Sequence, residues 1–181
     1  MVTQFIEDFL TEKECKEIIL FGESLKLQES QTYTKNGSQK NQDINKRHLA
    51  FIGSEKFSDL NKKVLNCLNS HNFYKNSEYT KIEYFVFNKY VCGDFLKYHF
   101  DGHAIENLGA TLTLIFQLNN DYEGGDILYK VSDNEFTLPK KTGSVFVFDS
   151  NLEHEISEVK NGIRYSLNCW PFLESKNKSL F

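Results

Sequence analysis

The stretch "GDFLKYHFDG", residues 93–102, combines the pattern of a β-strand with a histidine and an aspartate, two residue types that are common metal ligands in proteins. Glycine stands at both ends, and the residues between are mostly aromatic or apolar, which favours a strand. Successive side chains of a strand point to opposite faces of the sheet. His99 and Asp101, two residues apart, are therefore predicted to point in the same direction, on one face with Phe95 and Lys97.

Similar short runs, rich in Phe, Tyr, Val, Ile and Leu, occupy most of the chain after residue 80. They cover 81–90, 94–101, 110–118, 126–131, 143–149, 154–159 and 163–170. Glycine and asparagine separate them, and Asn161-Gly162 between the last two is typical of a tight hairpin turn. Short strands at this spacing predict an antiparallel sandwich or barrel.

Polar and apolar residues alternate in two of these runs. In 111–118 one face has Leu112, Leu114, Phe116 and Leu118, and the other has Thr111, Thr113, Ile115 and Gln117. In 163–170 one face has Arg164, Ser166, Asn168 and Trp170. The apolar faces are expected to pack in a core. The mixed faces either meet water or turn inward and line a polar pocket, and the alternation alone leaves both open.

The first 80 residues carry helical patterns instead. The tetrapeptide "TEKE", 11–14, fits a capping box with Thr11 as the N-cap, and apolar residues follow it at helical spacing. A second helix is predicted over 56–70 and a short strand over 47–52. The polar segment "QTYTKNGSQKNQDINK", 31–46, is predicted to be a surface loop or a lid over a functional site.

The composition is that of one ordinary globular domain, with 40% hydrophobic and 25% charged residues among 181. Sixteen Phe and nine Tyr favour β structure. A net charge of −4 gives no support for nucleic-acid binding, and no apolar run approaches the roughly 18 residues of a membrane span. The N-terminus lacks the apolar core of a signal peptide, and the four cysteines show no C-x-x-C spacing. A reducing cytoplasm is therefore the expected location.

His99 and Asp101 supply two of the three ligands in a site where two histidines and one carboxylate hold Fe(II) and leave other positions open. The third ligand must come from elsewhere in the chain, and His154 is the best candidate. A closed zinc site would need a fourth ligand, usually Cys, and none has the required spacing. Arg164 follows ten residues after His154. An inward-facing arginine is costly unless it is paired with an anion, and its guanidinium suits a carboxylate.

Each of these residues alone has an ordinary interpretation. His154 alone would be a structural histidine, and Arg164 alone a surface arginine. His103, just past the same stretch, is assigned no role. The four residues His99, Asp101, His154 and Arg164 together, in this order, favour a metal site that binds a carboxylate.

The region from Tyr84 to Trp170 resembles the Fe(II)- and 2-oxoglutarate-dependent dioxygenases, specifically their prolyl 4-hydroxylase-like branch. The segment "NKYVCGDFLKYHFD" resembles the family's Y-x-x-G…H-x-D pattern, and "LIFQLNNDYEGGDILY" resembles its Leu-Asn and Glu-Gly-Gly region. The segment "GSVFVFDSNLEHEISEVKNGIRYSLNCW" resembles its H-x-V…G-x-R…W ending.

The resemblance implies a mainly β fold with N-terminal helices and a double-stranded β-helix (jelly-roll) core. It implies a single 2-oxoglutarate dioxygenase domain over 1–181. Within it, residues 1–80 would be helical support with a substrate loop at 31–46, and residues 81–172 the catalytic core.

The resemblance also assigns roles within the site. It implies that His99, Asp101 and His154 bind Fe(II), and that 2-oxoglutarate chelates the metal while Arg164 pairs with its C5 carboxylate. Tyr90 matches a tyrosine that lines the cosubstrate pocket. Thr113 or Gln117, on the inward face of the next strand, is expected to supply a hydrogen bond to the same carboxylate.

The implied reaction uses O2 and 2-oxoglutarate to hydroxylate an unactivated C–H bond, releasing succinate and CO2, with ascorbate as a candidate reductant. The favoured substrate is a prolyl or other residue of a protein or peptide, and the alternative is a free amino acid or small metabolite. A nucleic-acid demethylase is disfavoured, because no arginine follows Arg164. A non-catalytic jelly-roll binding module is the alternative from a different class, and it predicts a broken triad or a lost arginine. No nucleic-acid or membrane partner is expected.

Overall fold

The computed structural model describes residues 2–34, 37–39, 43–71, 73–74, 77–102 and 112–175. The helices in this part of the chain are α1 (Glu12–Glu23) and α2 (Ser58–His71), with a 3-10 helix η1 (Ser54–Phe57) before α2. The strands of the first half are β1 (Thr3–Ile6), β2 (Gln28–Glu29), β3 (Thr32–Thr34), β4 (Gly37–Gln39), β5 (Asn45–Lys46), β6 (His48–Gly53), β7 (Ser77–Lys81), β8 (Tyr84–Tyr90) and β9 (Phe95–His99). The remaining strands are β10 (Leu112–Gln117), β11 (Glu123–Gly124), β12 (Ile127–Val131), β13 (Asn134–Thr137), β14 (Val145–Asp149), β15 (His154–Ile156), β16 (Val159–Asn161), β17 (Arg164–Cys169) and β18 (Phe172–Ser175). The prediction of a mainly β chain is confirmed.

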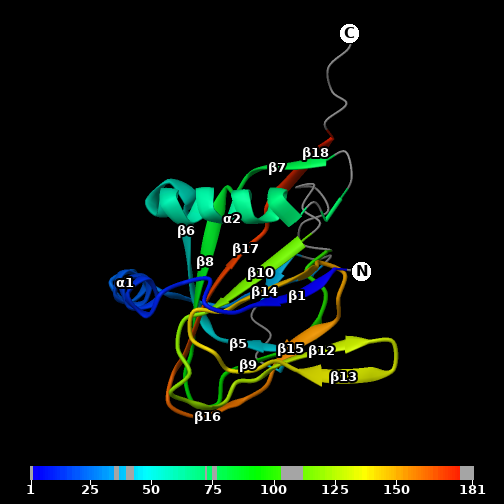
Figure 1. Ribbon diagram of the computed structural model, residues 1–181. Helices are drawn as coiled ribbons and strands as arrows, with labels where there is room; N and C mark the ends of the chain where they lie inside the picture. Colours follow the sequence, from blue (N-terminus) through cyan, green and yellow to red (C-terminus); the bar gives the residue numbers. More distant parts are fainter. Residues whose placement is uncertain are drawn as a thin grey trace.

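Two antiparallel sheets form the body of the molecule (Figure 1). The large sheet has the order β1-β14-β10-β17-β8-β6-β2, and the small sheet the order β13-β12-β15-β9-β5. In Figure 1, α2 and the small sheet lie on opposite sides of the molecule. No helix in the described ranges is long and apolar enough to cross a membrane.

Side chains on the two faces of the large sheet pack into two separate hydrophobic cores. One core packs against the helices and includes Cys15, Ile18, Leu60, Val64, Phe85, Phe87, Leu112, Leu114, Phe116, Leu118, Val145, Val147 and Leu167. The other core contains Tyr90, Leu96, Ile115, Ile127, Phe146, Phe148, Leu152, Ile156 and Val159. The predicted division of the run 111–118 is confirmed for the residues described. Because the mixed faces of β10 and β17 lie on the second side, their polar residues turn inward rather than to bulk water.

Helix α1 begins with the predicted capping box. Thr11 Oγ1 accepts a hydrogen bond from Glu14 N at 3.2 Å, and Glu14 Oε2 accepts one from Thr11 N at 2.7 Å. These two bonds satisfy backbone N–H groups that the first turn of a helix leaves without partners. The helix then buries Cys15 and Ile18 against the large sheet.

Replacing Thr11 by alanine is expected to lower the free energy of unfolding by about 1 kcal/mol, because the cap is lost. Urea unfolding followed by circular dichroism measures the change. Lys13→Ala is a matched control on the same turn, since its contact with Glu17 joins two largely exposed side chains at 3.8 Å. Equal stability losses in the two variants would show that the capping box contributes nothing specific.

The Asn161-Gly162 turn does not form the predicted hairpin. β16 pairs with β11, whereas β17 pairs with β8 and β10 of the large sheet. Gly162 does adopt a positive φ of 77°, as a tight turn requires. The local turn chemistry was therefore correct, but the turn connects strands of two different sheets.

The first 80 residues do more than provide helical support. β1 and β6 belong to the large sheet, and β5 pairs with β9 of the small sheet. Within the segment 31–46, predicted as a loop, β3 and β4 pair with each other and β5 ends the segment. Part of this segment is therefore strand, and it is joined to the strand that carries His99.

Candidate functional site

His99, Asp101 and His154 lie together on the inner side of the small sheet. His99 ends β9, Asp101 follows two residues later, and His154 begins β15. The two strands are antiparallel neighbours, with His154 paired directly with His99. The ring centroids of the two histidines are 4.2 Å apart, and one ligand atom from each of the three residues lies within 4.8 Å of the others.

Backbone carbonyls hold both histidine rings in the same tautomer. His99 Nδ1 lies 2.9 Å from Lys97 O, and His154 Nδ1 lies 3.0 Å from Leu152 O. A carbonyl only accepts, so each Nδ1 carries a proton and each Nε2 is the ring nitrogen available to a metal. The two Nε2 atoms lie 3.4 and 3.8 Å from the oxygens of Asp101. Burial lowers the pKa of His154 to about 4, with a smaller contribution from the charge of Arg47, so His154 is neutral at pH 7.

Hydrogen bonds fix the carboxylate of Asp101 in its ionised form. Burial raises the pKa of Asp101, but its contacts with His99, His154 and Thr113 hold that pKa well below its usual range. Asp101 Oδ2 accepts from Thr113 Oγ1 at 2.9 Å and from Trp170 Nε1 at 3.2 Å. These bonds orient the carboxylate toward the two histidines.

A β-bulge in β9 changes which side chains reach the site. His154 pairs with His99 and Ile156 with Leu96, so three steps on β9 match two on β15. Leu96 therefore lines the cavity together with His99 and Asp101, whereas Lys97 is exposed. The prediction that His99 and Asp101 point the same way holds, but placing Lys97 on their face was wrong because simple alternation does not pass through a bulge.

Arg164 lies at another part of the same cavity and is fully buried. Its Nη1 donates to Ser166 Oγ at 3.2 Å, and its Nη2 donates to Gln117 Oε1 at 3.5 Å. The Arg164 Cζ atom is 5.1 Å from the centroid of the Tyr90 ring. The structure therefore brings together Arg164, Tyr90 and Gln117, three residues to which the family resemblance assigns the cosubstrate.

Thr113 and Gln117 occupy different parts of the inner face of β10. Thr113 contacts Asp101 and lies 3.1 Å from Ser150 Oγ. Gln117 Nε2 donates to the carbonyl of Asn119 and to the hydroxyl of Tyr122. Thr113 is thus positioned to support the carboxylate of Asp101, and Gln117 to support Arg164.

Two residues at the cavity were not assigned a role from the sequence. Trp170 was placed on the correct face by alternation, but its bond to Asp101 was not foreseen. Arg47, between β5 and β6, lines the cavity and donates from Nη1 to the Tyr90 hydroxyl at 2.9 Å. Its place between Lys46 and His48 reads in the sequence as an ordinary basic surface stretch.

The residues fit a divalent metal together with a polar ligand. Two imidazole nitrogens and one carboxylate are the donor set that holds non-haem Fe(II) and leaves positions open. Buried polar atoms of the cavity lining also lack a hydrogen-bond partner within the described structure, namely Arg47 Nε, Asn88 Oδ1, Arg164 Nε and Asn168 Oδ1. Because buried polar groups are normally paired, this cavity suits a ligand that brings its own polar atoms.

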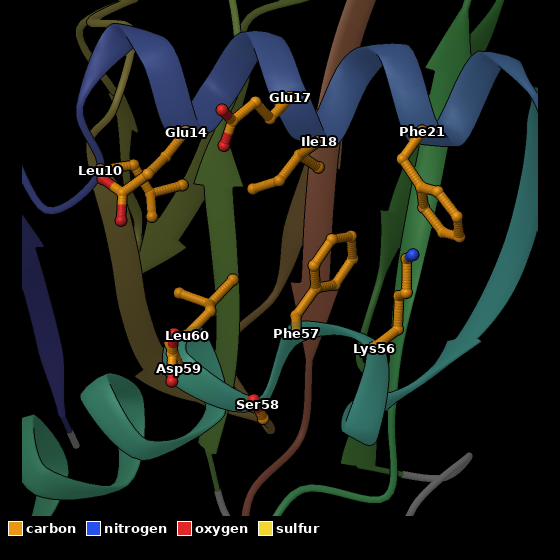
Figure 2. A pocket seen from close by; sticks show the side chains of 10 residues that line it. All are labelled: Leu10, Glu14, Glu17, Ile18, Phe21, Lys56, Phe57, Ser58, Asp59 and Leu60. Carbon is orange, nitrogen blue, oxygen red and sulfur yellow. The ribbon is translucent and has the colours of Figure 1, made fainter.

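A larger groove, of about 420 Å³, lies away from these residues, between α1 and the start of α2 (Figure 2). Figure 2 shows Ile18 and Phe57 pointing toward each other across it. Phe57 also contacts the rings of Phe21 and Phe85, with centroids 5.7 and 5.9 Å apart. The groove is not lined by His99, Asp101 or His154, nor by Arg47 or Arg164. It is therefore separate from the candidate site.

Comparison with known proteins agrees with this geometry. Residues 85–172, which contain the three candidate ligands and Arg164, match the model of the 2OG-Fe(II) oxygenase superfamily. Over this stretch the chain is similar to the oxygenases of this superfamily. Its relatives and structural neighbours include members of the prolyl hydroxylase-like branch.

Two curated relatives are PKHD-type hydroxylases. One, from Prochlorococcus marinus, is 30% identical over 84 residues, which are 45% of this chain and 37% of the relative. The other, from Shewanella oneidensis, is 30% identical over 93 residues, which are 47% of this chain and 41% of the relative. The chain therefore matches less than half the length of these relatives.

Solved structures share the fold over nearly the whole chain. A prolyl-4-hydroxylase of Pseudomonas putida has a TM-score of 0.73 at 16% identity. The matched region covers 94% of this chain and 91% of the hydroxylase chain. A prolyl hydroxylase of Trichoplax adhaerens, in complex with a hypoxia inducible factor peptide fragment, has a TM-score of 0.72 at 18% identity, with 94% and 83% covered. At these identities the likeness concerns the fold alone.

Proposed function

We propose that this protein is an Fe(II)- and 2-oxoglutarate-dependent oxygenase that hydroxylates an unactivated C–H bond. The observation that carries the proposal is one cavity lined by the donor set His99, Asp101 and His154 and by the buried Arg164. The chain acts as one domain over 1–181. Its large and small sheets together form the double-stranded β-helix of the family.

The proposed roles follow from the contacts. His99 and His154 bind the metal through Nε2 and Asp101 through its carboxylate, while Arg164 binds the C5 carboxylate of 2-oxoglutarate. Gln117 holds the Arg164 guanidinium and Tyr90 covers it. Thr113, assigned to the cosubstrate by the family resemblance, instead orients Asp101. With O2, the bound metal and cosubstrate supply an oxidation that couples loss of CO2 to hydroxylation.

The favoured substrate is a prolyl or other residue of a protein or peptide. This choice is supported by the prolyl hydroxylases among the structural neighbours, one of which is in complex with a peptide. A free amino acid or small metabolite is the alternative substrate class. A non-catalytic binding module is disfavoured, because His99, Asp101, His154 and Arg164 line one cavity together.

Succinate release from 2-oxoglutarate, with and without added Fe(II) and with ascorbate as reductant, tests the proposal. We expect iron-dependent succinate from the wild type, and a rate lower by about a hundredfold or more in His99→Ala, because a metal ligand is lost. Cosubstrate binding to the wild type and to Arg164→Ala provides the second readout. If no succinate forms and both bind 2-oxoglutarate equally poorly, the binding-module hypothesis replaces this one.

A further inference from the structure

Arg47 is a second arginine in the cavity that contains the metal-binding residues. It lies just before β6, and its half-buried side chain lines the cavity with His99, Asp101, His154 and Arg164. Its Cζ atom is 5.9 Å from the centroid of the Tyr90 ring, and its Nη1 donates to the Tyr90 hydroxyl.

The two basic residues beside Arg47 in the sequence both lie next to one acid, Asp94. Lys46 Nζ lies 3.4 Å from Asp94 Oδ1, and His48 Nδ1 lies 3.6 Å from Asp94 Oδ2. Alternate residues of an extended segment face opposite sides, so Arg47 points away from Asp94 and into the cavity.

Arg47 has no such acid. Within the described part of the chain, no carboxylate forms an ion pair with it, and its buried Nε has no hydrogen-bond partner. A buried guanidinium N–H without an acceptor is costly, and a ligand that supplies a carboxylate would remove that cost.

The charges of the cavity favour a further anion even after cosubstrate binding. The charged side chains that line it are Arg47, Asp101 and Arg164, with both histidines neutral as ligands. A divalent metal and the dianion 2-oxoglutarate balance each other, and Arg164 balances Asp101. The cavity then keeps one excess positive charge, which is that of Arg47.

We propose that Arg47 binds a carboxylate of the prime substrate. This inference rests on the proposed function and narrows the substrate to an acid. The carboxylate belongs either to a free amino acid or other small acid, or to an acidic side chain of a peptide. Both sources offer the same chemistry to the guanidinium, and competition between them decides which one is used.

Trifluoroacetate is the probe for this carboxylate site, and its binding is measured by ¹⁹F NMR. The protein is first loaded with Mn(II) and saturated with 2-oxoglutarate. We expect the paramagnetic metal to broaden the trifluoroacetate resonance, and we expect Arg47→Gln to weaken binding about tenfold or more. Arg47→Lys should retain part of the affinity. Lys46→Gln is the matched control, since it removes the neighbouring charge without reaching the cavity. The neutral trifluoroacetamide should not bind.

The affinity for 2-oxoglutarate separates the possible failures. If Arg47→Gln weakens 2-oxoglutarate binding as strongly as Arg164→Gln does, Arg47 serves the cosubstrate and the inference is overturned. Equal trifluoroacetate binding in the wild type and Arg47→Gln, or none in either, also overturns it. If the wild type fails to bind 2-oxoglutarate at all, the proposed function fails instead, and trifluoroacetate binding that depends on Arg47 would still stand on its own.

Displacement of trifluoroacetate then identifies the source of the carboxylate. Displacement by L-proline indicates a free amino acid. Displacement by the N-acetylated, C-amidated peptide Ala-Asp-Ala indicates an acidic side chain. Displacement by neither would show that the site accepts a carboxylate from neither source, and would overturn the inference.

Discussion

Asp101→Ala is expected to lower the affinity for Fe(II) or Mn(II) by about a hundredfold or more and to abolish iron-dependent succinate formation. Loss of a residue that merely supports a ligand costs about 10- to 100-fold in metal affinity, so loss of the ligand itself should cost at least as much. Asp101 is also the one acidic side chain among the described residues that line the cavity. Its removal leaves two imidazoles in a cavity with Arg47 and Arg164, whose positive charges repel a cation.

Mn(II) titration followed by electron paramagnetic resonance measures the affinity, with circular dichroism as a test of folding. Thr113→Val is the matched control, because it removes the 2.9 Å bond to Asp101 Oδ2 and leaves the carboxylate in place. A loss of about tenfold is expected for this variant. If Asp101→Ala bound Mn(II) as tightly as the wild type, the carboxylate would not be a ligand.

The strand faces that carry the candidate ligands and Arg164 could be predicted because their signals are local. His99 and Asp101 share a face through simple strand periodicity, and the polar side of β17, which includes Arg164, follows from the same rule. Simple periodicity fails between Leu96 and His99. The extra residue of the bulge becomes visible only when β9 is aligned with β15, and that pairing joins segments far apart in the sequence.

The features that sequence reasoning missed depend on such non-local pairing. Asn161-Gly162 makes a tight turn, but a turn motif does not specify which strands pair on either side of it. Arg47 lies in a polar segment with no periodic pattern, and it reaches the cavity because β5 pairs with β9 and β6 pairs with β8. Turn and helix-cap chemistry act within a few residues, whereas the choice of sheet neighbours depends on packing of the whole core.

Arg164→Met is expected to lower the affinity for 2-oxoglutarate by about thirtyfold or more without destabilising the unliganded protein. The guanidinium is fully buried, and within the described residues it donates to Ser166 and Gln117, both neutral, while its Nε has no partner. Removing one member of a buried charged pair costs about 2–5 kcal/mol of binding free energy, and the lower limit corresponds to a factor of about 30 in Kd. Methionine keeps much of the apolar volume that packs beside Tyr90.

The unliganded variant should be at least as stable as the wild type, because replacing a buried charge by an apolar side chain is often neutral or stabilising. The melting temperature therefore tests both parts of the prediction. In the wild type with bound metal, 2-oxoglutarate at about one hundred times its Kd adds about 2.7 kcal/mol of stability, which raises Tm by several degrees. In Arg164→Met the same concentration should leave Tm almost unchanged.

Lys89→Met is the matched control for Arg164→Met. Lys89 neighbours Tyr90 on β8, but its Nζ pairs with Glu23 at 2.7 Å rather than lining the cavity. This variant should keep the Tm increase on addition of 2-oxoglutarate. A large drop in the Tm of unliganded Arg164→Met would show that Arg164 serves mainly to hold β17 and β10 together. An unchanged increase with 2-oxoglutarate would show that the cosubstrate binds elsewhere. The predicted combination, with Tm maintained and the response to 2-oxoglutarate lost, is specific to a buried guanidinium whose partner is the cosubstrate.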